Sequence, residues 1–405
     1  MKIPFSPPDM RGNEAEYVRR VLESGWITTG PLSKEFEKKI SAYCGVERTV
    51  CLSSGTAAME LALRVLGVGP GDEVITTPYT FSASAAVIEH VGAKIVFVDV
   101  EKDSLFMSPA AVAAAVTPRT KAVIPVDIGG VPCDYDALLA ALAAKKQLFR
   151  PANEVQTQLG RIAVVGDCAH SFGATYKGKS VARYPDFACF SFHAVKNLTT
   201  AEGGAVCFSG IGDIGADELY AQFMLLALHG QNKDALAKTK LGAWEYDILL
   251  PGYKCNMTDI MAAIGLAQLE RYDEMLARRA EMVARYNEFF DGTDVAPVCH
   301  EGADFYGSHH LYITRVRGAN VETRGAIIED MARDGVCANV HYKPLPMMTA
   351  YRNLGFDIRD YPNAFDFYRN EITLPLHTLL TDDMIDFAAN SCLAAVRAHK
   401  GQAYV

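Results

Sequence analysis

The sequence predicts an α/β protein with a mostly parallel sheet covered by helices on both faces, followed by a smaller α+β unit. The first observation behind this is that short apolar runs of strand length alternate with amphipathic helical patterns through the first half of the chain. The second is length, because 405 residues exceed what a single hydrophobic core usually supports. We therefore expect two domains, residues 1–258 and residues 259–405, the second beginning with a linking helix.

Composition narrows the class of protein. Hydrophobic residues make up 50% of the chain and charged residues 21%, which is typical of a globular enzyme. The net charge of −9 and the absence of a Lys/Arg block argue against nucleic acid as a partner. No apolar run is long enough to span a membrane, and the N-terminus lacks the apolar core of a signal peptide, so no membrane partner is expected.

The ten cysteines are scattered singly, and none forms a C-x-x-C pair. This pattern predicts neither a structural zinc site nor a thioredoxin-type site, and we expect no metal. Several cysteines lie inside apolar runs, where a reduced thiol behaves as a small hydrophobe. We therefore expect a reducing compartment, most simply the cytoplasm.

Two helices open the chain, at residues 14–24 and 32–43, and the first ends at Gly25. The turn-rich segment between them carries Trp26, which is either part of a plain linker or a pocket-lining residue. A strand at 49–52 then leads through a turn of small residues into a helix that ends at Gly67. Free N–H groups and the positive end of the helix dipole make such a turn either an anion cradle or an ordinary N-cap.

Further strands are predicted at 72–77, 94–100 and 121–127, with helices starting after Phe81 and at 109–116 and 134–145. Phe81 stands at a strand-to-helix turn on the same sheet edge as the small-residue turn. It is either a core aromatic or a ring that stacks on a flat cofactor. Residues 147–160 are polar and show no periodicity, so a surface loop is predicted there.

Residues 161–208 carry the candidate chemistry. A strand at 162–165 ends at Gly166-Asp167, a strand at 187–192 leads to Lys196, and a third strand lies at 205–208. Ligands of open α/β sheets bind at the C-terminal ends of the strands. A carboxylate and an amine at that edge suggest a pyridoxal phosphate (PLP) site, in which Lys196 forms the Schiff base and Asp167 pairs with the protonated ring nitrogen. A single Asp or Lys is more often a solvated surface charge, so the neighbouring motifs matter.

The remaining chain predicts a helix at 217–228, a polar connection at 231–242 and a turn-rich bridge at 251–259. One long helix at 260–290 is expected to link the two domains. The smaller α+β unit is expected to contain strands at 311–317, 338–342 and 372–376 and helices at 322–333, 362–369 and 382–398.

Five segments resemble motifs of the DegT/DnrJ/StrS family, and their order and spacing match as well: WITTGP, SSGTAAMELAL, GDCAHSFGATYKGK, FSFHAVKNLTTAEGGAV and PGYKCNMTDIMAAIGLAQL. The resemblance extends from Trp26 to the segment 374–377. It implies a fold-type I PLP enzyme with a seven-stranded large domain. It also implies amino transfer, with L-glutamate as donor, to the keto group of a nucleotide diphosphate-sugar in amino-sugar or surface-polysaccharide synthesis; carbon 3 and carbon 4 both stay open.

The resemblance also implies roles for single residues. Lys196 would hold PLP covalently and move the proton, Asp167 would keep the ring nitrogen protonated, and His170 would lie beside the ring near its phenolic oxygen. Phe81 would stack on the ring. The cofactor phosphate would be bound by Gly55, Thr56, Ala57 and Ser191.

The bridge departs from the commonest family pattern. Many relatives carry Gly-Tyr-Asn-x-Arg, whose Asn reaches the phosphate of the neighbouring subunit, but here Lys254 and Asn256 occupy those two positions. A homodimer with a shared active site is therefore implied, and either residue could reach the phosphate. Many relatives also have His where Asp127 stands. The resemblance also points to Trp26, Thr29, His341 and Tyr342, which match family segments near the sugar. These residues either contact the substrate or pack at the domain junction.

Three alternatives remain open. A PLP-dependent sugar dehydratase of the same family would have histidine in place of Lys196. An enzyme that aminates a cyclitol or a keto-sugar without a nucleotide would share all the motifs. A non-catalytic sensor or structural protein would be expected to have lost site residues, whereas Asp167, Ser191 and Lys196 are all present.

Overall fold

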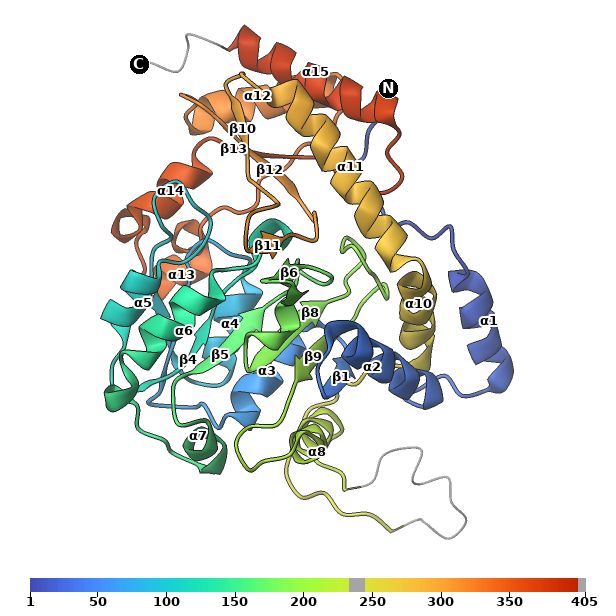
Figure 1. Ribbon diagram of the computed structural model, residues 1–405, viewed down its shortest axis with the longest axis vertical. Coiled ribbons are helices and arrows are strands. Elements are labelled where there is room, and N and C mark those ends of the chain that lie inside the picture. Colours follow the sequence, from blue (N-terminus) through green and yellow to red (C-terminus); the bar gives the residue numbers. More distant parts are fainter. Residues whose placement is uncertain (233–244, 400–405) are drawn as a thin grey trace.

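The computed structural model describes residues 1–232 and 245–399. Its main feature is a seven-stranded sheet in the order β1-β9-β8-β5-β4-β2-β3, shown in Figure 1. Only β9 runs antiparallel to its neighbours, so the predicted mostly parallel sheet is confirmed. The strands are β1 (Arg48–Leu52), β2 (Glu73–Thr76), β3 (Lys94–Phe97), β4 (Thr120–Ile124), β5 (Ala163–Asp167), β8 (Phe187–Ser191) and β9 (Gly204–Phe208).

Helices cover both faces of this sheet because successive strand residues point to opposite sides. In β5, Val165 packs into the core formed with α3 (Gly55–Val65), α4 (Ala83–His90), α7 (Glu154–Leu159) and α8 (Ala216–Ala227). The adjacent Val164 packs into the opposite core, formed with α2 (Pro31–Cys44), α5 (Pro109–Ala115), α6 (Tyr135–Ala143) and α10 (Asp259–Glu270).

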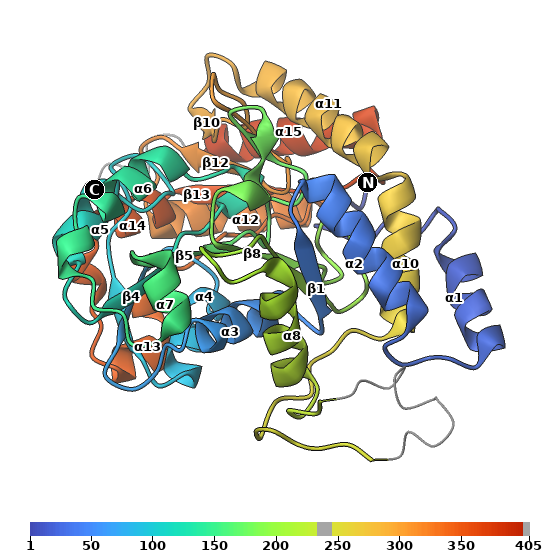
Figure 2. The ribbon, with the colours of Figure 1, turned by 60° about the horizontal axis from the view of Figure 1, so that its bottom comes forward.

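The N-terminal helices are anchored on α10. α1 (Glu14–Ser24) packs along α10, and Figure 2 shows α2 on its other side. The Asp259 carboxylate accepts hydrogen bonds from the N–H groups of Gly30 (2.8 Å) and Ser33 (2.9 Å), which satisfies free donors at the start of α2. This contact fixes the turn that carries Trp26 and Thr29 against the start of α10.

A second, antiparallel sheet has the order β10-β12-β13 and lies at the top of Figure 1. Its strands are β10 (Val295–Pro297), β12 (Tyr312–Val316) and β13 (Glu371–Leu374), and its helices are α11 (Tyr272–Phe290), α12 (Val321–Arg333) and α15 (Asp382–Ala398). We call these six elements the C-terminal unit. Ile3 is fully buried in its core and bridges to Val336, so the first residues of the chain belong to this core.

Short elements join the two sheets. A small three-stranded sheet pairs β11 (Phe305–Tyr306) with β6 (Thr175–Tyr176), which in turn pairs with β7 (Lys179–Ser180). α13 (Thr349–Asn353) and α14 (Pro362–Tyr368) lie beside α4 and α5 in Figure 1. Within the described ranges, no helix is both long enough and apolar enough to cross a bilayer.

The surface loop predicted at 147–160 is wrong, because residues Glu154–Leu159 form α7. The helix is short and shows no clear apolar periodicity, but both of its ends are capped. The Asn153 side chain accepts from Gln156 N–H at 2.9 Å, and Gly160 ends the helix in the left-handed conformation. Buried Gln156 also donates to the Leu66 carbonyl at 2.8 Å, which ties the helix to the sheet's helical layer.

Two further sequence predictions need correction. The single helix predicted at 260–290 is two helices, because Arg271 leaves the helical conformation (φ −118°, ψ 13°) and donates to Asp9 Oδ1 at 2.8 Å. The strand predicted at 338–342 is reduced to one bridge between Asn339 and Thr373, since the next available N–H, that of His341, donates to the Glu371 side chain at 2.9 Å. Most of the polar connection predicted at 231–242 lies outside the described residues.

Candidate active site

A cavity of about 390 Å³ lies at the C-terminal edge of the seven-stranded sheet. It is lined by residues from six separate parts of the chain: the β1–α3 turn, the β2–α4 turn, Val126 after β4, the end of β5, the segment from β8 to β9 and residues 341–342. The residues predicted from the sequence that line it are Gly55, Thr56, Phe81, Asp167, His170, Ser191, Lys196, His341 and Tyr342.

Asp167 is the last residue of β5 and is 5% exposed. Its Oδ2 accepts from the Ser84 hydroxyl at 2.6 Å, and its Oδ1 accepts from the Ala169 N–H at 3.2 Å. Burial raises the pKa of Asp167, while these two hydrogen bonds and the charge of Lys196 act in the opposite direction. A buried carboxylate of this kind is stabilised by a cationic N–H partner in the cavity.

Lys196 follows β8 in a turn closed by a hydrogen bond from its own N–H to the His193 carbonyl, at 2.9 Å. Burial lowers the pKa of Lys196 to about 8, and the charge of Asp167 partly offsets this effect. The amine is therefore much more often neutral and nucleophilic near neutral pH than a solvent-exposed lysine. Asp167 and Lys196 line one cavity without forming an ion pair with each other, within the part of the chain that the structure describes.

The N-terminus of α3 forms one wall. Ser54 caps this helix by accepting from the Ala57 N–H at 3.0 Å, so Ala57, a predicted phosphate contact, already has a partner and does not line the cavity. The first N–H groups of α3, those of Gly55 and Thr56, have no intrahelical acceptor and lie at the cavity. A Cβ on Gly55 would come within 3.1 Å of the Phe190 carbonyl oxygen, so the close approach to β8 requires glycine.

His170 lies on the opposite side and is 8% exposed. Its Nδ1 accepts from the Gly129 N–H at 3.2 Å, which leaves the proton of the neutral ring on Nε2, 3.2 Å from the Tyr342 hydroxyl. Burial and the nearby Lys196 lower the pKa of His170 well below its usual value, so the ring is neutral. Phe81 is 61% exposed, lines the cavity, and has its ring 5.9 Å from the Tyr342 ring.

Four of the predicted site residues lie together but outside this lining. Asn256 donates to the Thr29 hydroxyl and Lys254 donates to Asn256, while Trp26 Nε1 donates to the Thr29 carbonyl at 3.1 Å. Lys254 is exposed. The structure therefore brings Trp26, Thr29, Lys254 and Asn256 into one cluster on the surface, separate from the Lys196 cavity of the same chain.

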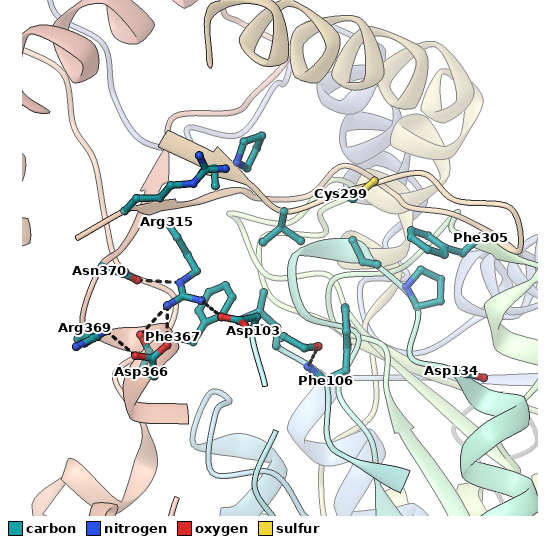
Figure 3. Close-up of a pocket in the computed structure, with 18 of the residues that line it drawn as sticks. Asp103, Phe106, Asp134, Cys299, Phe305, Arg315, Asp366, Phe367, Arg369 and Asn370 are labelled. Carbon is teal, nitrogen blue, oxygen red and sulfur yellow. Dashed lines mark hydrogen bonds and ion pairs between the residues drawn. The ribbon is translucent and has the colours of Figure 1, made fainter. Parts of the chain in front are cut away.

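A larger cavity of about 940 Å³ lies between the C-terminal unit and the large sheet's loops (Figure 3). Its central cation, Arg315, already donates to Asp103 at 3.0 Å and to Asp366 at 2.8 Å, and it lies 4.9 Å from the centre of the Phe367 ring. Arg369 is paired with Asp366 at 2.7 Å. These charges hold β12 against α14 and the loop at Asp103, and they do not form a nucleophile or acid–base pair.

The smaller cavity fits PLP. Its volume is in the range of cofactor sites, its donor set combines an amine, a buried carboxylate and free helix N-terminal N–H groups, and an aromatic face lies at its mouth. Among the residues that the structure describes, no group of three His, Cys, Asp or Glu side chains could hold a metal ion.

Sequence reasoning missed several residues that support this site. Ser84, in α4, is 83 positions from Asp167 in sequence, and no local motif links the two. His310 lies with its ring 4.4 Å from that of His170, and its Nδ1 is 2.9 Å from Asn197 Oδ1, directly after Lys196. Only knowledge of which loops meet at the sheet edge could have found these contacts.

Comparison with known proteins gives a consistent result. The sequence model of the DegT/DnrJ/EryC1/StrS aminotransferase family matches residues 8–391. The spore coat polysaccharide biosynthesis protein SpsC of Bacillus subtilis (strain 168) is 39% identical over 391 residues, 95% of this chain and 94% of SpsC.

Solved structures agree with the sequence matches. Spr1654 of Streptococcus pneumoniae, a proposed sugar aminotransferase, superposes in its PMP form with a TM-score of 0.96 at 50% identity, covering 98% of this chain and 100% of that chain. PseC of Helicobacter pylori, an aminotransferase involved in the biosynthesis of pseudoaminic acid, superposes with a TM-score of 0.86 at 27% identity, covering 98% and 100%.

Proposed function

Because this chain belongs to the DegT/DnrJ/EryC1/StrS aminotransferase family, we propose that it aminates the keto group of a nucleotide diphosphate-sugar, with L-glutamate as donor. The protein is a PLP-dependent transaminase that acts on sugars. The observation that best supports the proposed amination is that one cavity combines Lys196, Asp167 and the free N-terminus of α3. A place in surface-polysaccharide synthesis is supported by the similarity to SpsC.

PLP, when bound, supplies an electron sink that stabilises negative charge on the carbon next to the transferred nitrogen. We assign Lys196 to covalent attachment of the cofactor and Asp167 to its ring nitrogen. Gly55, Thr56 and the Ser191 hydroxyl bind the phosphate in this proposal, and Phe81 covers the ring. His170, held neutral, places an N–H beside the ring rather than a positive charge.

Lys196 also moves the proton. With the cofactor bound and the Lys196 amine free, this amine, whose pKa burial lowers to about 8, would accept a proton from the donor carbon. It returns a proton to the sugar carbon in the second half-reaction. The Ser84 hydroxyl and the Ala169 N–H donate to Asp167 and favour its ionised form, against the effect of burial, which raises the pKa of Asp167.

A homodimer with a shared active site is part of the proposal. Large apolar side chains are exposed near the bridge, including Ile248 (54%) and Leu249 (60%), and exposure of this kind is typical of a subunit interface. The Lys254–Asn256 cluster lies outside its own chain's cavity, as expected of residues that complete the site of a second copy.

The test is spectroscopic. The purified protein loaded with PLP should show the visible absorbance of covalently bound cofactor, and glutamate should bleach it. A panel of keto-sugar nucleotides should then restore the absorbance, and the sugar that restores it fastest is the substrate. Lys196→Ala should bind no PLP covalently; if this variant still transaminates, the assignment is wrong.

The same panel separates the remaining candidates. Restoration by a cyclitol ketone or a free keto-sugar, but not by any nucleotide-linked sugar, would replace the proposed acceptor. A dehydratase of this family would remove water from the sugar without transferring nitrogen to it. The presence of Lys196 argues against that outcome.

We also propose a cytoplasmic location. All ten cysteines are free thiols in the structure, and seven of them are buried. Free buried thiols are usual in a reducing compartment.

A further inference from the structure

We propose that Glu371 and Thr373 are positioning residues that decide which ring nitrogen of His341 carries the proton, and therefore whether the cofactor cavity meets a hydrogen-bond donor or an acceptor there. The inference rests on the proposed function only in its last step, which assigns the keto-sugar as the molecule that meets His341.

The three side chains form a continuous hydrogen-bonded chain. Glu371 and Thr373 are both fully buried on β13. The Thr373 hydroxyl bonds to Glu371 Oε1 at 2.5 Å and lies 3.0 Å from His341 Nδ1, while Glu371 Oε2 accepts from the His341 N–H at 2.9 Å. The carboxyl group therefore holds His341 both through its backbone and through the Thr373 hydroxyl.

The position of His341 is fixed independently of its ring proton. The Tyr79 hydroxyl donates to the His341 carbonyl at 3.0 Å, and the Phe5 ring stacks on the imidazole at 5.4 Å. His341 lines the cavity, and Nε2 has no partner among the residues that the structure describes. Nε2 is therefore the ring nitrogen left for a bound molecule.

The chain can run in two directions, because a hydroxyl both donates and accepts. With Glu371 ionised, Thr373 donates to the carboxylate and accepts from Nδ1–H, so Nε2 is an acceptor. With Glu371 protonated, the acid donates to Thr373, Thr373 donates to Nδ1, and Nε2 carries a proton. Every group is satisfied in both arrangements, so the proton on Glu371 selects the tautomer of His341.

The local electrostatics permit this selection. Burial lowers the pKa of His341 to about 4, so the ring is neutral and has a tautomer to select. Burial also raises the pKa of Glu371 to about 8, so Glu371 is mostly protonated at neutral pH. His341 then carries its proton on Nε2, which acts as a hydrogen-bond donor. As pH rises through about 8, Glu371 loses its proton and Nε2 becomes an acceptor.

Other charged or titratable groups face this chain. Arg324 of α12 lies near Glu371, and Arg315 is the residue opposite Glu371 on the neighbouring strand β12. Tyr79 and Tyr342 also lie near Glu371. His341 is approached by Lys196, His170 and His310. Lys196 is the one with a pKa near that of Glu371, so the experiment must separate the two.

The primary measurement is the tautomer of His341 in PLP-loaded protein with ¹⁵N-labelled histidine, by two-bond ¹H–¹⁵N NMR, with the signals assigned by their loss in His341→Gln. Between about pH 6.5 and about pH 9.5 the wild-type proton should move from Nε2 to Nδ1. Glu371→Gln keeps the shape of the acid and has an N–H to donate to Thr373, so it should hold the proton on Nε2 at every pH. It leaves Lys196 unchanged, so a crossover that persists in Glu371→Gln would assign the change to a group other than Glu371 and overturn the proposal.

Two substitutions of Thr373 form a matched pair of variants. Thr373→Val keeps the shape but removes the hydroxyl, and it should make the His341 tautomer indifferent to the residue at 371. Thr373→Ser restores the hydroxyl and should restore the wild-type crossover. If Thr373→Val behaves as wild type, the relay through the hydroxyl is wrong.

Steady-state kinetics test the last step, which assigns the keto-sugar as the molecule that contacts His341. The KM of wild type for the keto-sugar should rise at least about threefold as pH passes through about 8, whereas that of Glu371→Gln should stay constant. The glutamate half-reaction should be equal in both. Equal losses in both half-reactions, with a lower melting temperature, would indicate a purely structural role and overturn the proposal. Failure of every keto-sugar to react would count against the proposed function alone, because the NMR measurement needs no substrate.

Discussion

At the scale of single residues, burial changes the pKa values of the groups that line the site. Burial lowers the pKa of Lys196 to about 8 and raises that of Asp167, while His170 is kept neutral. Each shift follows mainly from loss of solvent; charged or hydrogen-bonding partners oppose it at Asp167 and Lys196, whereas Lys196 adds to it at His170. Two predictions follow from these partners.

The first concerns cofactor capture. After PLP is removed, the rate of covalent recapture should rise with pH through about 8 and then level off, because only the neutral Lys196 amine attacks the aldehyde. Stopped-flow absorbance measures this rate. Asp167→Asn removes the charge that raises the pKa of Lys196, so its profile should shift to lower pH. A profile still rising above about pH 10 would indicate an ordinary, solvated lysine.

The second concerns Ser84, which donates to Asp167 at 2.6 Å. Ser84→Ala leaves one oxygen of a buried carboxylate without its donor and should lower kcat about tenfold, or about 1.4 kcal/mol. Ser391→Ala is the matched control, because Ser391 donates to Asp334 at 2.8 Å in the C-terminal unit. Steady-state kinetics of both variants decide the point, and equal effects would remove Ser84 from the site.

At the scale of elements, the strand-to-helix connections place the chemistry. β1 leads to the N-terminus of α3, β2 leads to Phe81 and α4, and β5 and β8 end near Asp167 and Lys196. Parallel strands bring these ends to one edge of the sheet. The hydrophobic pattern predicted all four strands, and with them the shared edge. It did not predict α7, because this short helix has only Val155 and Leu159 on its apolar side and depends on caps at Asn153 and Gly160 as well.

The capping of α7 gives a third prediction. The Asn153 side chain accepts from Gln156 N–H and donates to the Leu66 carbonyl, both at 2.9 Å. Asn153→Ala should therefore lower the free energy of unfolding by about 2 kcal/mol, measured by urea denaturation. Asn320→Ala removes a cap of α12 at 2.8 Å that has no such second bond, and it should cost about 1 kcal/mol. Equal costs would show that the contact to Leu66 contributes nothing; neither variant should change KM.

At the scale of the whole molecule, two sheets meet around shared connections. We propose the division into residues 1–258 and 259–405, supported by the separate core of the C-terminal unit. Ile3 packs into that core, and Arg315 joins β12 to Asp103 (Figure 3), so each part depends on the other for stability. The cluster of Trp26, Thr29, Lys254 and Asn256 lies on the surface, and the proposed dimer gives it a function.

The dimer gives the fourth prediction. Leu249→Glu places a charge in the proposed interface and should shift the protein from dimer to monomer in analytical ultracentrifugation, with loss of activity. Leu354→Glu is the control, since Leu354 is 50% exposed but lies away from the bridge. A Leu249→Glu variant that stays dimeric would place the interface elsewhere.

A mixing experiment tests the shared site directly. Lys196→Ala and Lys254→Ala should each be nearly inactive. An equal mixture of the two should regain up to about a quarter of wild-type activity, because about half of its dimers are mixed and one of the two sites in each mixed dimer is intact. If the mixture stays inactive while mixed dimers form, Lys254 serves the cavity of its own chain.

The sequence by itself determined the strands of the large sheet, their shared edge and the two ends that carry Asp167 and Lys196, because each buried strand requires its own short apolar run. The tertiary structure alone decided which side chains meet there: Ser84 with Asp167, His310 with His170, and Glu371 with His341. The physical reason is that these contacts join residues far apart in the chain. Their distances depend on how every intervening element packs, which no local pattern of hydrophobic residues records.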